Sequence, residues 1–339
     1  MLYATLSDRF LLAGRVLTVL ILMCSFSASA RDTDITTITL PVVDGQGATT
    51  MKFHVNARLD KPNSNITHAI IMLHGNGDDG LEWAKELSAM AAGRHVDAST
   101  LIVAPWFQDP NSDDPRPRDQ VQWPLFWAFG LKSESSPSVT SFAVLDRIID
   151  MLADRQRFPK LTKIVIAGFS AGGQAAHRYG MIGKALPRAE AAGIAIGLVV
   201  GSSRTYTYFS DQRVQANGEF GATNFRRCPL SNVWPYGLTH MEITLSAYLP
   251  TVTADEIAVL QKAYLARKPL YLMGANDNEN DSGNGCAESV QGAGRRQRLE
   301  NYAKYLSSLG DHPNVLIVPD LGHNHRVFDG KQQEDALFN

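Results

Sequence analysis

A serine stands between two glycines in the segment 168–172, which reads GFSAG. The apolar run 164–167 before it predicts a buried strand, and the residues after it predict a helix that starts near Ala171. Glycines on both sides allow a turn too tight for Cβ atoms, and such a turn lifts the Ser170 hydroxyl above the end of the strand. We therefore predict that Ser170 is a nucleophile; the alternative is a serine that only caps the helix.

A second glycine-rich turn, HGNG at 74–77, follows another apolar run. Attack by a serine on a carbonyl leaves negative charge on oxygen, which backbone N–H groups stabilise. We predict that Asn76 and Gly77 supply such groups together with Ala171. The alternative is an ordinary glycine-rich turn, and His74 is expected to be structural.

A base is needed to take the proton of the serine, and the end of the chain offers two histidines. The predicted last strand, 315–318, is followed by His323 and His325. We predict that His323, directly after Gly322, is the base, with His325 as the alternative. An H-x-H pair also suits a metal ion, but no third ligand with convincing spacing accompanies it, so no metal is predicted.

A carboxylate that orients the base is expected between the serine and the histidine, after a strand. Asp277 follows the apolar run 270–273, and Glu279 and Asp281 are alternatives in the same loop. The spacing from Asp277 onward also resembles a calcium-binding loop. That interpretation fails because Ser282 takes the place of the glycine such loops need, and because a strand precedes the loop instead of a helix.

Composition sets the class of protein. The chain has 339 residues, of which 44% are hydrophobic and 19% charged, and its formal net charge is -2. These values exclude a disordered chain and give no basic surface for nucleic acid. Residues 1–30 combine a basic start, a short apolar run and the ending ASA, which predicts a signal peptide and a secreted or periplasmic mature chain, 31–339. The apolar run is too short to cross a bilayer, so no stable membrane insertion is expected after cleavage.

Cysteine usage agrees with export. The chain has three cysteines, and removal of the predicted signal peptide takes away Cys24. The remaining pair, Cys228 and Cys286, is a candidate disulfide in an oxidising compartment. The alternative is two buried free thiols.

Apolar runs alternate with segments of helical periodicity along the chain. This alternation predicts an α/β fold with a mostly parallel sheet and helices on both faces. The predicted strands are 35–40, 51–55, 69–73, 100–104, 163–167, 194–200, 269–273 and 315–318, and the predicted helices are 81–92, 142–152, one from 171, and 299–309.

One region, 204–262, is rich in aromatic residues and breaks the alternation. We predict an insertion at the carboxyl edge of the sheet, where open α/β sheets bind ligands. It is either a possible lid or a surface that packs for its own stability. Trp106, Trp127 and Trp234 are predicted to bind substrate, together with Trp123, although tryptophans serve cores equally well.

The order of HGNG, Ser170, Asp277 and His323 resembles the α/β-hydrolase superfamily over nearly all of residues 38–328. Within it, the chain is similar to a group of exported hydrolases that largely lack assigned substrates. The matching segments are SFAVLD at 141–146, Phe158-Pro159, Gly173-Gln174, Arg178-Tyr179, Cys228-Pro229, WPYGL at 234–238, Gln291-Gly292, Arg295, Arg298, and Pro319 to His323. The chain departs from that group at Phe169, where a histidine is expected, and at Asn324-His325.

The resemblance implies the α/β-hydrolase fold and a serine hydrolase with nucleophile, acid and base at Ser170, Asp277 and His323. The reaction would be acyl transfer to water through an acyl-enzyme, which needs no cofactor. The predicted substrate is a small-molecule or polymer ester, and the predicted enzyme a carboxylesterase. The alternatives are an amidase or peptidase with the same residues, or a non-catalytic binding protein on this scaffold.

Overall fold

A computed structural model of the chain describes residues 35–42, 49–110, 119–123, 126–249, 252–278 and 285–339. The predicted signal peptide, residues 1–30, lies outside this range, as do Glu279 and Asp281. Among the described helices, none combines the length and the apolar composition that a membrane span requires.

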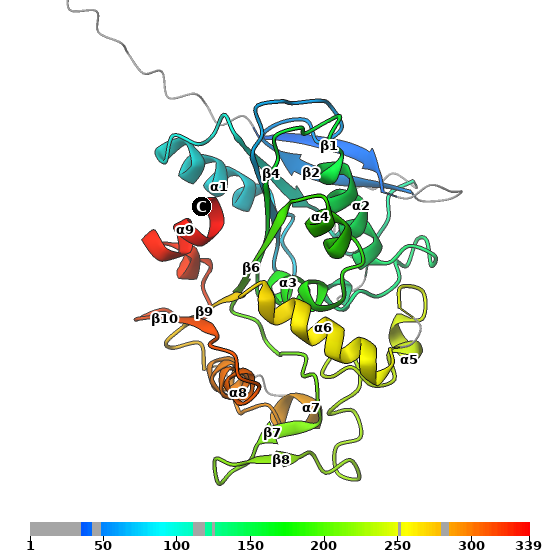
Figure 1. The fold of residues 1–339 in the computed structure, drawn as a ribbon, viewed down its shortest axis with the longest axis vertical. Helices are drawn as coiled ribbons and strands as arrows, with labels where there is room; N and C mark the ends of the chain where they lie inside the picture. The colour runs from blue at the N-terminus through cyan, green and yellow to red at the C-terminus, as the bar shows by residue number, and fades with distance from the viewer. Residues whose placement is uncertain (1–34, 43–48, 111–118, 124–125, 250–251, 279–284) are drawn as a thin grey trace, which may run out of the picture. The chain divides into compact units, whose positions relative to one another are not determined.

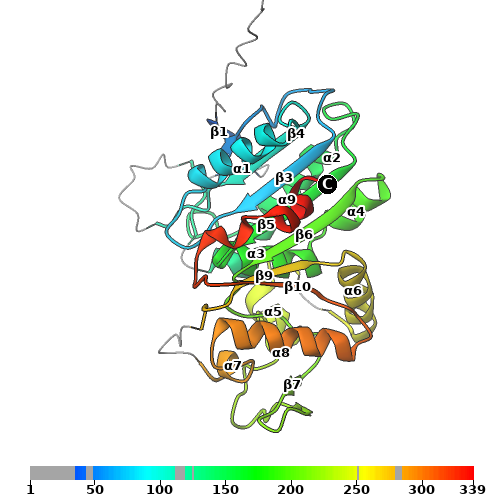
Figure 2. The same cartoon turned by 90° about the vertical axis from the view of Figure 1, so that its left-hand side faces the viewer.

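A mixed sheet of eight strands forms the centre of the described chain, in the order β1-β2-β4-β3-β5-β6-β9-β10 (Figures 1 and 2). The first two strands pair antiparallel with each other and β2 pairs antiparallel with β4; all later pairs are parallel. The strands are β1 (Thr36–Pro41), β2 (Thr50–Val55), β3 (His68–Leu73), β4 (Thr100–Pro105), β5 (Lys163–Phe169), β6 (Ala195–Gly201), β9 (Leu270–Gly274) and β10 (Asn314–Val318).

Helices cover both faces of the sheet, because alternate strand residues point to opposite sides. Ile70 and Met72 join the apolar cluster under α1 (Leu81–Gly93) and α9 (Lys331–Phe338). Ile71 and Leu73 join the cluster on the other face. That face carries α2 (Ser141–Ala153), α3 (Ala171–Ile182), α4 (Leu186–Ala191), α6 (Ala254–Ala266) and α8 (Arg295–Ser308). The predicted α/β architecture with helices on both faces is confirmed.

The predicted elements match the structure closely where the sequence is periodic. Every predicted strand is present with its bounds shifted by one residue or a few. The last long helix starts at Arg295, before the predicted start at Leu299, because it buries the arginines of its first turn: Arg295 is 8% and Arg298 0% exposed. The short helix α4 and the C-terminal helix α9 were not predicted.

The aromatic region 204–262 contains regular structure that its sequence did not reveal. It holds the hairpin β7 (Gln212–Val214) and β8 (Phe220–Ala222), the helix α5 (Met241–Leu245), and the start of α6. A capping box begins α6: the Thr253 side chain accepts from the N–H of Glu256, whose carboxylate accepts from the N–H of Thr253.

Long-range side-chain contacts join residues 204–249 to residues 286–298, and we call these two segments the cross-linked region. Cys228 and Cys286 form a disulfide with 5.6 Å between their Cα atoms. The Gln291 side chain pairs with both backbone groups of Tyr206, at 2.9 Å each. Glu288, in the short helix α7 (Cys286–Ser289), accepts hydrogen bonds from the Arg204 guanidinium at 3.0 and 2.9 Å.

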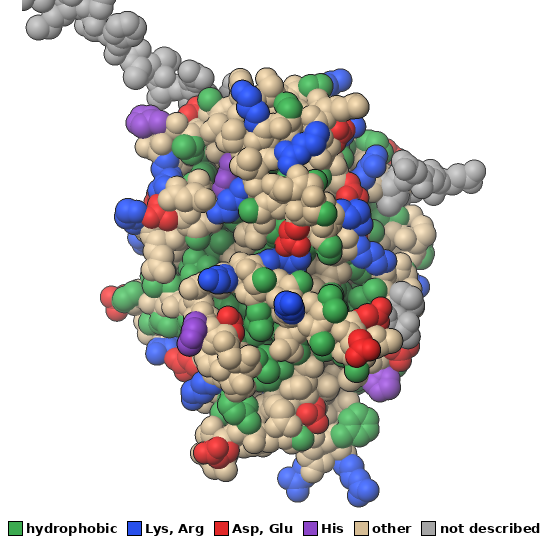
Figure 3. All heavy atoms as spheres, viewed as in Figure 1, with side chains coloured by type: hydrophobic (Ala, Val, Ile, Leu, Met, Phe, Trp, Pro, Cys, Tyr) green, Lys and Arg blue, Asp and Glu red, His purple; other side chains and the backbone are tan. Residues whose placement is uncertain are grey.

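A buried arginine organises the hairpin of this region. Arg213 is fully buried, and its guanidinium lies 3.6 Å from the centre of the Tyr208 ring. It donates to the carbonyl oxygens of Ser210, Ser231 and Tyr236. Together with the two-stranded β7-β8 sheet, these bonds hold the backbone of the segment. On the face drawn in Figure 3, acidic, basic and hydrophobic side chains are interspersed.

Candidate active site

Ser170 occupies a sharp turn between β5 and α3. Its backbone has φ 57° and ψ -112°, a conformation that a non-glycine residue rarely adopts, and its N–H donates to the Gly201 carbonyl at 2.9 Å. The neighbouring glycines are required by contact: a Cβ on Gly172 would lie 1.8 Å from the Leu73 carbonyl oxygen, and one on Gly168 would lie 2.2 Å from the Gly172 carbonyl oxygen. The turn therefore presents Ser170 at the carboxyl ends of the central strands.

Two hydrogen bonds connect Ser170, His323 and Asp277 in a row. His323 Nε2 lies 3.0 Å from Ser170 Oγ, and His323 Nδ1 lies 2.8 Å from Asp277 Oδ2. Because an ionised carboxylate only accepts, Nδ1 carries the proton, and Nε2 is left to accept from the serine hydroxyl. Asp277 is fully buried, whereas the His323 side chain is 22% exposed. The arrangement holds an imidazole nitrogen against a serine hydroxyl.

The loops that carry Asp277 and His323 are joined by backbone contacts. Ala275 donates to the Val318 carbonyl at 2.8 Å, and Asn276 donates to the Leu321 carbonyl at 2.7 Å. A Cβ on Gly274 would lie 2.3 Å from the Gly322 carbonyl oxygen, so only glycine allows the two loops to approach this closely. These contacts bring Asp277 and His323 together from strands that are neighbours in the sheet.

The alternative residues lie elsewhere or outside the described chain. His325 is directed away from the serine: its Nε2 lies 3.6 Å from a Glu86 oxygen, and its ring meets the Trp83 ring edge-on. Glu279 and Asp281 lie in the undescribed segment 279–284. Among the residues that the structure describes, no group of three or more His, Cys, Asp or Glu side chains is placed to hold a metal ion.

His74 fixes the turn that follows β3. It is buried, and burial lowers its pKa, so the ring is neutral. Its Nε2 accepts from the Phe107 N–H at 3.0 Å, so Nδ1 carries the proton and donates to the Gly75 carbonyl at 2.6 Å. In a trans peptide the N–H points opposite to the carbonyl, so this bond directs the Asn76 N–H away from His74. Gly77 has φ 76°, which favours glycine.

The predicted oxyanion groups come from the 74–77 turn and from the start of α3. A Cβ on Gly75 would be 3.8 Å from Ser170 Cβ, which places the 74–77 turn against Ser170. Ala171 is the first residue of α3, where backbone N–H groups have no partner within the helix. The dipole of α3 adds partial positive charge at the same end.

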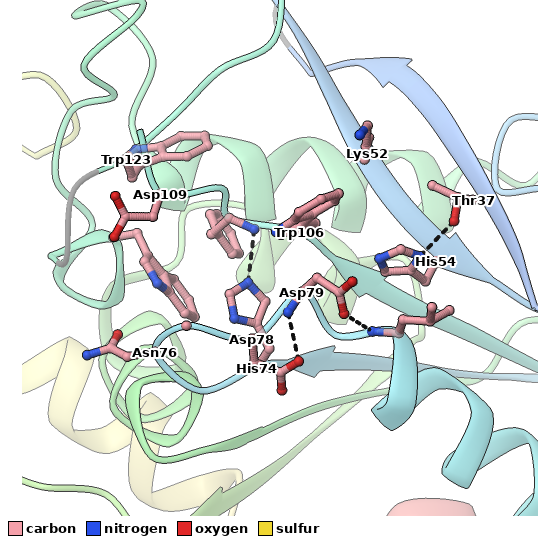
Figure 4. Close-up of a pocket in the computed structure, with 14 residues that line it drawn as sticks. Thr37, Lys52, His54, His74, Asn76, Asp78, Asp79, Trp106, Asp109 and Trp123 are labelled. Carbon is pink, nitrogen blue, oxygen red and sulfur yellow. Dashed lines mark hydrogen bonds between the residues drawn. The ribbon is translucent and has the colours of Figure 1, made fainter. Parts of the chain in front are cut away.

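A cavity of about 710 Å³ opens beside the 74–77 turn (Figure 4). Asn76, Gly77, Trp106 and Trp127 line it, as does Trp123. Trp127 is 3% exposed and stacks on Phe107, with ring centres 4.3 Å apart.

Trp234 is not among the residues that line this cavity. It is 2% exposed, its Nε1 donates to the Phe129 carbonyl at 2.8 Å, and its ring packs edge-on against Phe142. These contacts are those of a core tryptophan.

Sequence reasoning missed Arg295 as a neighbour of the predicted acid. One of its guanidinium nitrogens lies 3.5 Å from Asp277 Oδ1, the oxygen that His323 does not use. The arginine is 8% exposed, so this pair is shielded from water. No local pattern relates Arg295 to Asp277, because the contact depends on how α8 packs against the loop after β9. His54 and Lys52, which also line the cavity, were missed for the same reason.

Comparison with known proteins agrees with this architecture. No protein-family model and no curated protein matches the sequence. Many solved structures are similar, among them the two that follow. Poly(aspartic acid) hydrolase-1 from Sphingomonas sp. KT-1 has a TM-score of 0.54 and 18% identity, over 90% of this chain and 98% of that one. LpqC, a poly(3-hydroxybutyrate) depolymerase from Bordetella parapertussis, has a TM-score of 0.55 and 18% identity, over 86% of both chains. The protein has the α/β-hydrolase fold that its sequence predicts.

Proposed function

We propose that the protein is a serine hydrolase that cleaves carboxylic esters through an acyl-enzyme. The observation that carries this proposal is the row of two hydrogen bonds from Ser170 through His323 to Asp277. The contacts are those that the reaction requires: one imidazole nitrogen lies within hydrogen-bond distance of the hydroxyl, and the other lies within hydrogen-bond distance of a carboxylate oxygen.

The reaction follows from these positions. His323 Nε2 takes the proton of Ser170 as its oxygen attacks the ester carbonyl, and Asp277 stabilises the imidazolium that forms. The N–H groups of Ala171 and of the 74–77 turn donate to the oxygen that becomes negative. The imidazolium returns its proton to the leaving alcohol. His323 then activates a water molecule, which releases the acid and restores the serine.

An ester is the proposed substrate because an alcohol needs less protonation to leave than an amine does. One of the two similar structures is named as a depolymerase of poly(3-hydroxybutyrate), a polyester, so a polymer ester is a candidate beside a small one. We further propose that 204–262 is an insertion that borders the site and could act as a lid. The predicted signal peptide and the Cys228–Cys286 disulfide support export to a secreted or periplasmic location.

Covalent labelling tests the mechanism directly. Intact mass after treatment with a fluorophosphonate probe should show one adduct on the wild type and none on Ser170→Ala. The exposed Ser64→Ala is the matched control and should be labelled like the wild type. Hydrolysis of p-nitrophenyl acetate by Ser170→Ala or His323→Gln should fall by about 10⁴-fold or more in kcat. An adduct on folded Ser170→Ala, or no adduct on the wild type, would contradict the proposal.

A further inference from the structure

We propose that the cavity beside the 74–77 turn binds a neutral, hydroxyl-rich group such as a sugar ring, so that the enzyme acts on carbohydrate esters. This inference rests on the proposed serine-hydrolase activity and names its substrate class. The cavity has about 710 Å³, within the range of small-molecule sites. Ser170 and His323 are not among the lining residues; the cavity adjoins the serine through the 74–77 turn, because Asn76 and Gly77 line it and Gly75 lies beside Ser170.

The charges around the cavity suit neither an anion nor a cation. Three carboxylates line it, those of Asp78, Asp79 and Asp109, and they repel an anionic chain. The Lys52 ammonium lines the same cavity and lies 4.6 Å from the centre of the Trp106 ring, the aromatic face that would otherwise attract a cation. A hydroxyl group donates to carboxylates and accepts from an ammonium, so it uses both kinds of partner.

The two aspartates that follow the 74–77 turn, Asp78 and Asp79, are held in place by hydrogen bonds from neighbouring backbone N–H groups. Asp78 Oδ1 accepts from the N–H groups of Asp79 and Gly80, at 2.7 and 3.0 Å. Asp79 Oδ1 accepts from the Leu81 N–H at 2.8 Å, at the start of α1. In each aspartate the accepting atom is Oδ1, and these bonds fix both carboxylates at the wall of the cavity (Figure 4). Acceptors fixed in this way are preorganised for ligand hydroxyls.

A buried histidine lies in the wall. His54 is 3% exposed, and its Nδ1 lies 2.9 Å from the Thr37 hydroxyl. Its Nε2 makes no hydrogen bond of good geometry among the described residues, and the Asp79 backbone is a neighbouring polar group. Figure 4 shows the His54 ring between Thr37 and the space beside Trp106 and Asp79. Burial lowers the pKa of His54, so the ring is neutral and offers one polar nitrogen, which a hydroxyl can satisfy in either tautomer.

Tryptophans contribute apolar surface to the wall. Trp106 is partly exposed, with the Lys52 ammonium over its ring and His54 stacked on it, while Trp127 and Trp123 line the cavity at 3% and 1% exposure. The C–H groups of a sugar ring can contact the exposed part of Trp106, while its hydroxyls reach the polar groups at the rim. An alkyl alcohol would leave those polar groups without partners, which disfavours it.

A pair of matched esters tests the inference on the mature enzyme. Methyl 6-O-acetyl-α-D-glucopyranoside and cyclohexylmethyl acetate share the acetyl group and a six-membered ring on a primary carbon, but only the first has hydroxyls. We expect kcat/KM to be at least about tenfold higher for the sugar ester, the effect of one hydrogen bond to a charged group. Acetylcholine and 3-acetoxypropanoate, both acetate esters of a primary alcohol, serve as the cationic and anionic probes, and both should be poorer than the sugar ester.

Substitutions of residues in the cavity wall test whether these residues cause the preference for the sugar ester. Asp79→Asn keeps the Oδ1 acceptor that starts α1, and Lys52→Met removes the opposite charge. Both should lower the ratio of the two kcat/KM values by about fivefold or more, because each removes a partner of the hydroxyls. Glu219→Gln, exposed at the hairpin turn, is the matched control and should leave the ratio unchanged.

The outcomes separate this inference from the proposed function. A ratio near one, in an enzyme whose Ser170 reacts with fluorophosphonate, would overturn the sugar site and leave the hydrolase intact. Preference for acetylcholine that increases in Lys52→Met would assign the cavity to cations instead and would also overturn it. Absence of labelling on Ser170 would contradict the hydrolase proposal itself.

Discussion

The turn around Ser170 and the cross-linked region are held by two different kinds of contact. At the turn, backbone meets backbone: the chain at Gly172 passes so close to the Leu73 carbonyl that no side chain fits. In the cross-linked region side chains span the gaps, as Arg213 does with three carbonyls and Gln291 with Tyr206. The backbone contacts at the turn tolerate no added atom. In the cross-linked region the stability is shared among several side-chain bonds, and a substitution removes only one of them.

The largest expected loss of stability comes from adding one carbon atom at the turn around Ser170. Gly172→Ala should cost more than about 4 kcal/mol of unfolding free energy or prevent folding, because its Cβ would lie 1.8 Å from the Leu73 oxygen. Gly93→Ala is the matched control: it ends α1, and nothing lies within 4 Å of its Cβ. It should change stability by between zero and about 1 kcal/mol, in the favourable direction. Urea unfolding of both variants checks this, and a stable Gly172→Ala would refute the contact argument.

Removal of the covalent link tests the other side of the comparison. Cys228→Ser with Cys286→Ser opens a connection between residues 58 positions apart. The chain-entropy relation then gives a loss of about 4 kcal/mol in the free energy of unfolding. Urea unfolding of this double variant, beside the wild type with and without a reductant, measures it. A loss under about 1 kcal/mol would mean that the side-chain bonds hold the region without the disulfide.

Acid should weaken the sheet at the opposite end from the site. His68 starts β3, and its Nε2 donates to the Leu337 carbonyl at 2.7 Å; burial lowers its pKa from 6.5 to about 4. Between pH 6.5 and 4 the His68 ring is protonated in the unfolded chain but neutral in the folded one. The contribution of His68 to the free energy of unfolding is therefore fully present above pH 6.5. It is lost as pH falls towards 4, by about 3 kcal/mol. His68→Gln, which can still donate to Leu337, should flatten this dependence in urea unfolding at pH 4.5, 5.5 and 7. An unchanged slope would remove His68 from the explanation.

The smallest expected effect concerns Arg295, where the two regions meet. We expect it to act as a positioning residue, through its contact with Asp277 Oδ1. Arg295→Met should lower kcat for p-nitrophenyl acetate about tenfold with KM nearly constant, because Asp277 would lose a partner that holds it under His323. Arg295→Lys should recover part of that loss. A fall in stability with kcat intact would make the arginine structural only.

The sequence predicts the central strands and the turn around Ser170 well. Uninterrupted apolar runs identify the central strands, and a glycine on either side of Ser170 marks the turn. Strand ends place Asp277 and His323 at one edge of the sheet. The bounds of these elements follow from local composition, so little about them depends on distant residues.

The cross-linked region and the cavity were beyond prediction because their contacts are long-range. Arg213 satisfies carbonyls at residues 231 and 236, and no periodicity records that role. The hairpin of β7 and β8 has strands of only three residues each, too short for an alternating pattern. Trp234 illustrates the same limit, since its sequence does not reveal that it packs on Phe142.

The position of β10 has a consequence for how the protein inactivates. β10 is the last strand of the sheet and pairs with β9 on one side, and its burial is only partial. Its amides should exchange with deuterium earlier than those of β5, because an edge strand can detach without global unfolding. The loop that carries His323 follows β10 directly, so each such detachment separates the histidine from Ser170. Catalytic activity should therefore disappear at a lower temperature than the circular dichroism signal of the sheet.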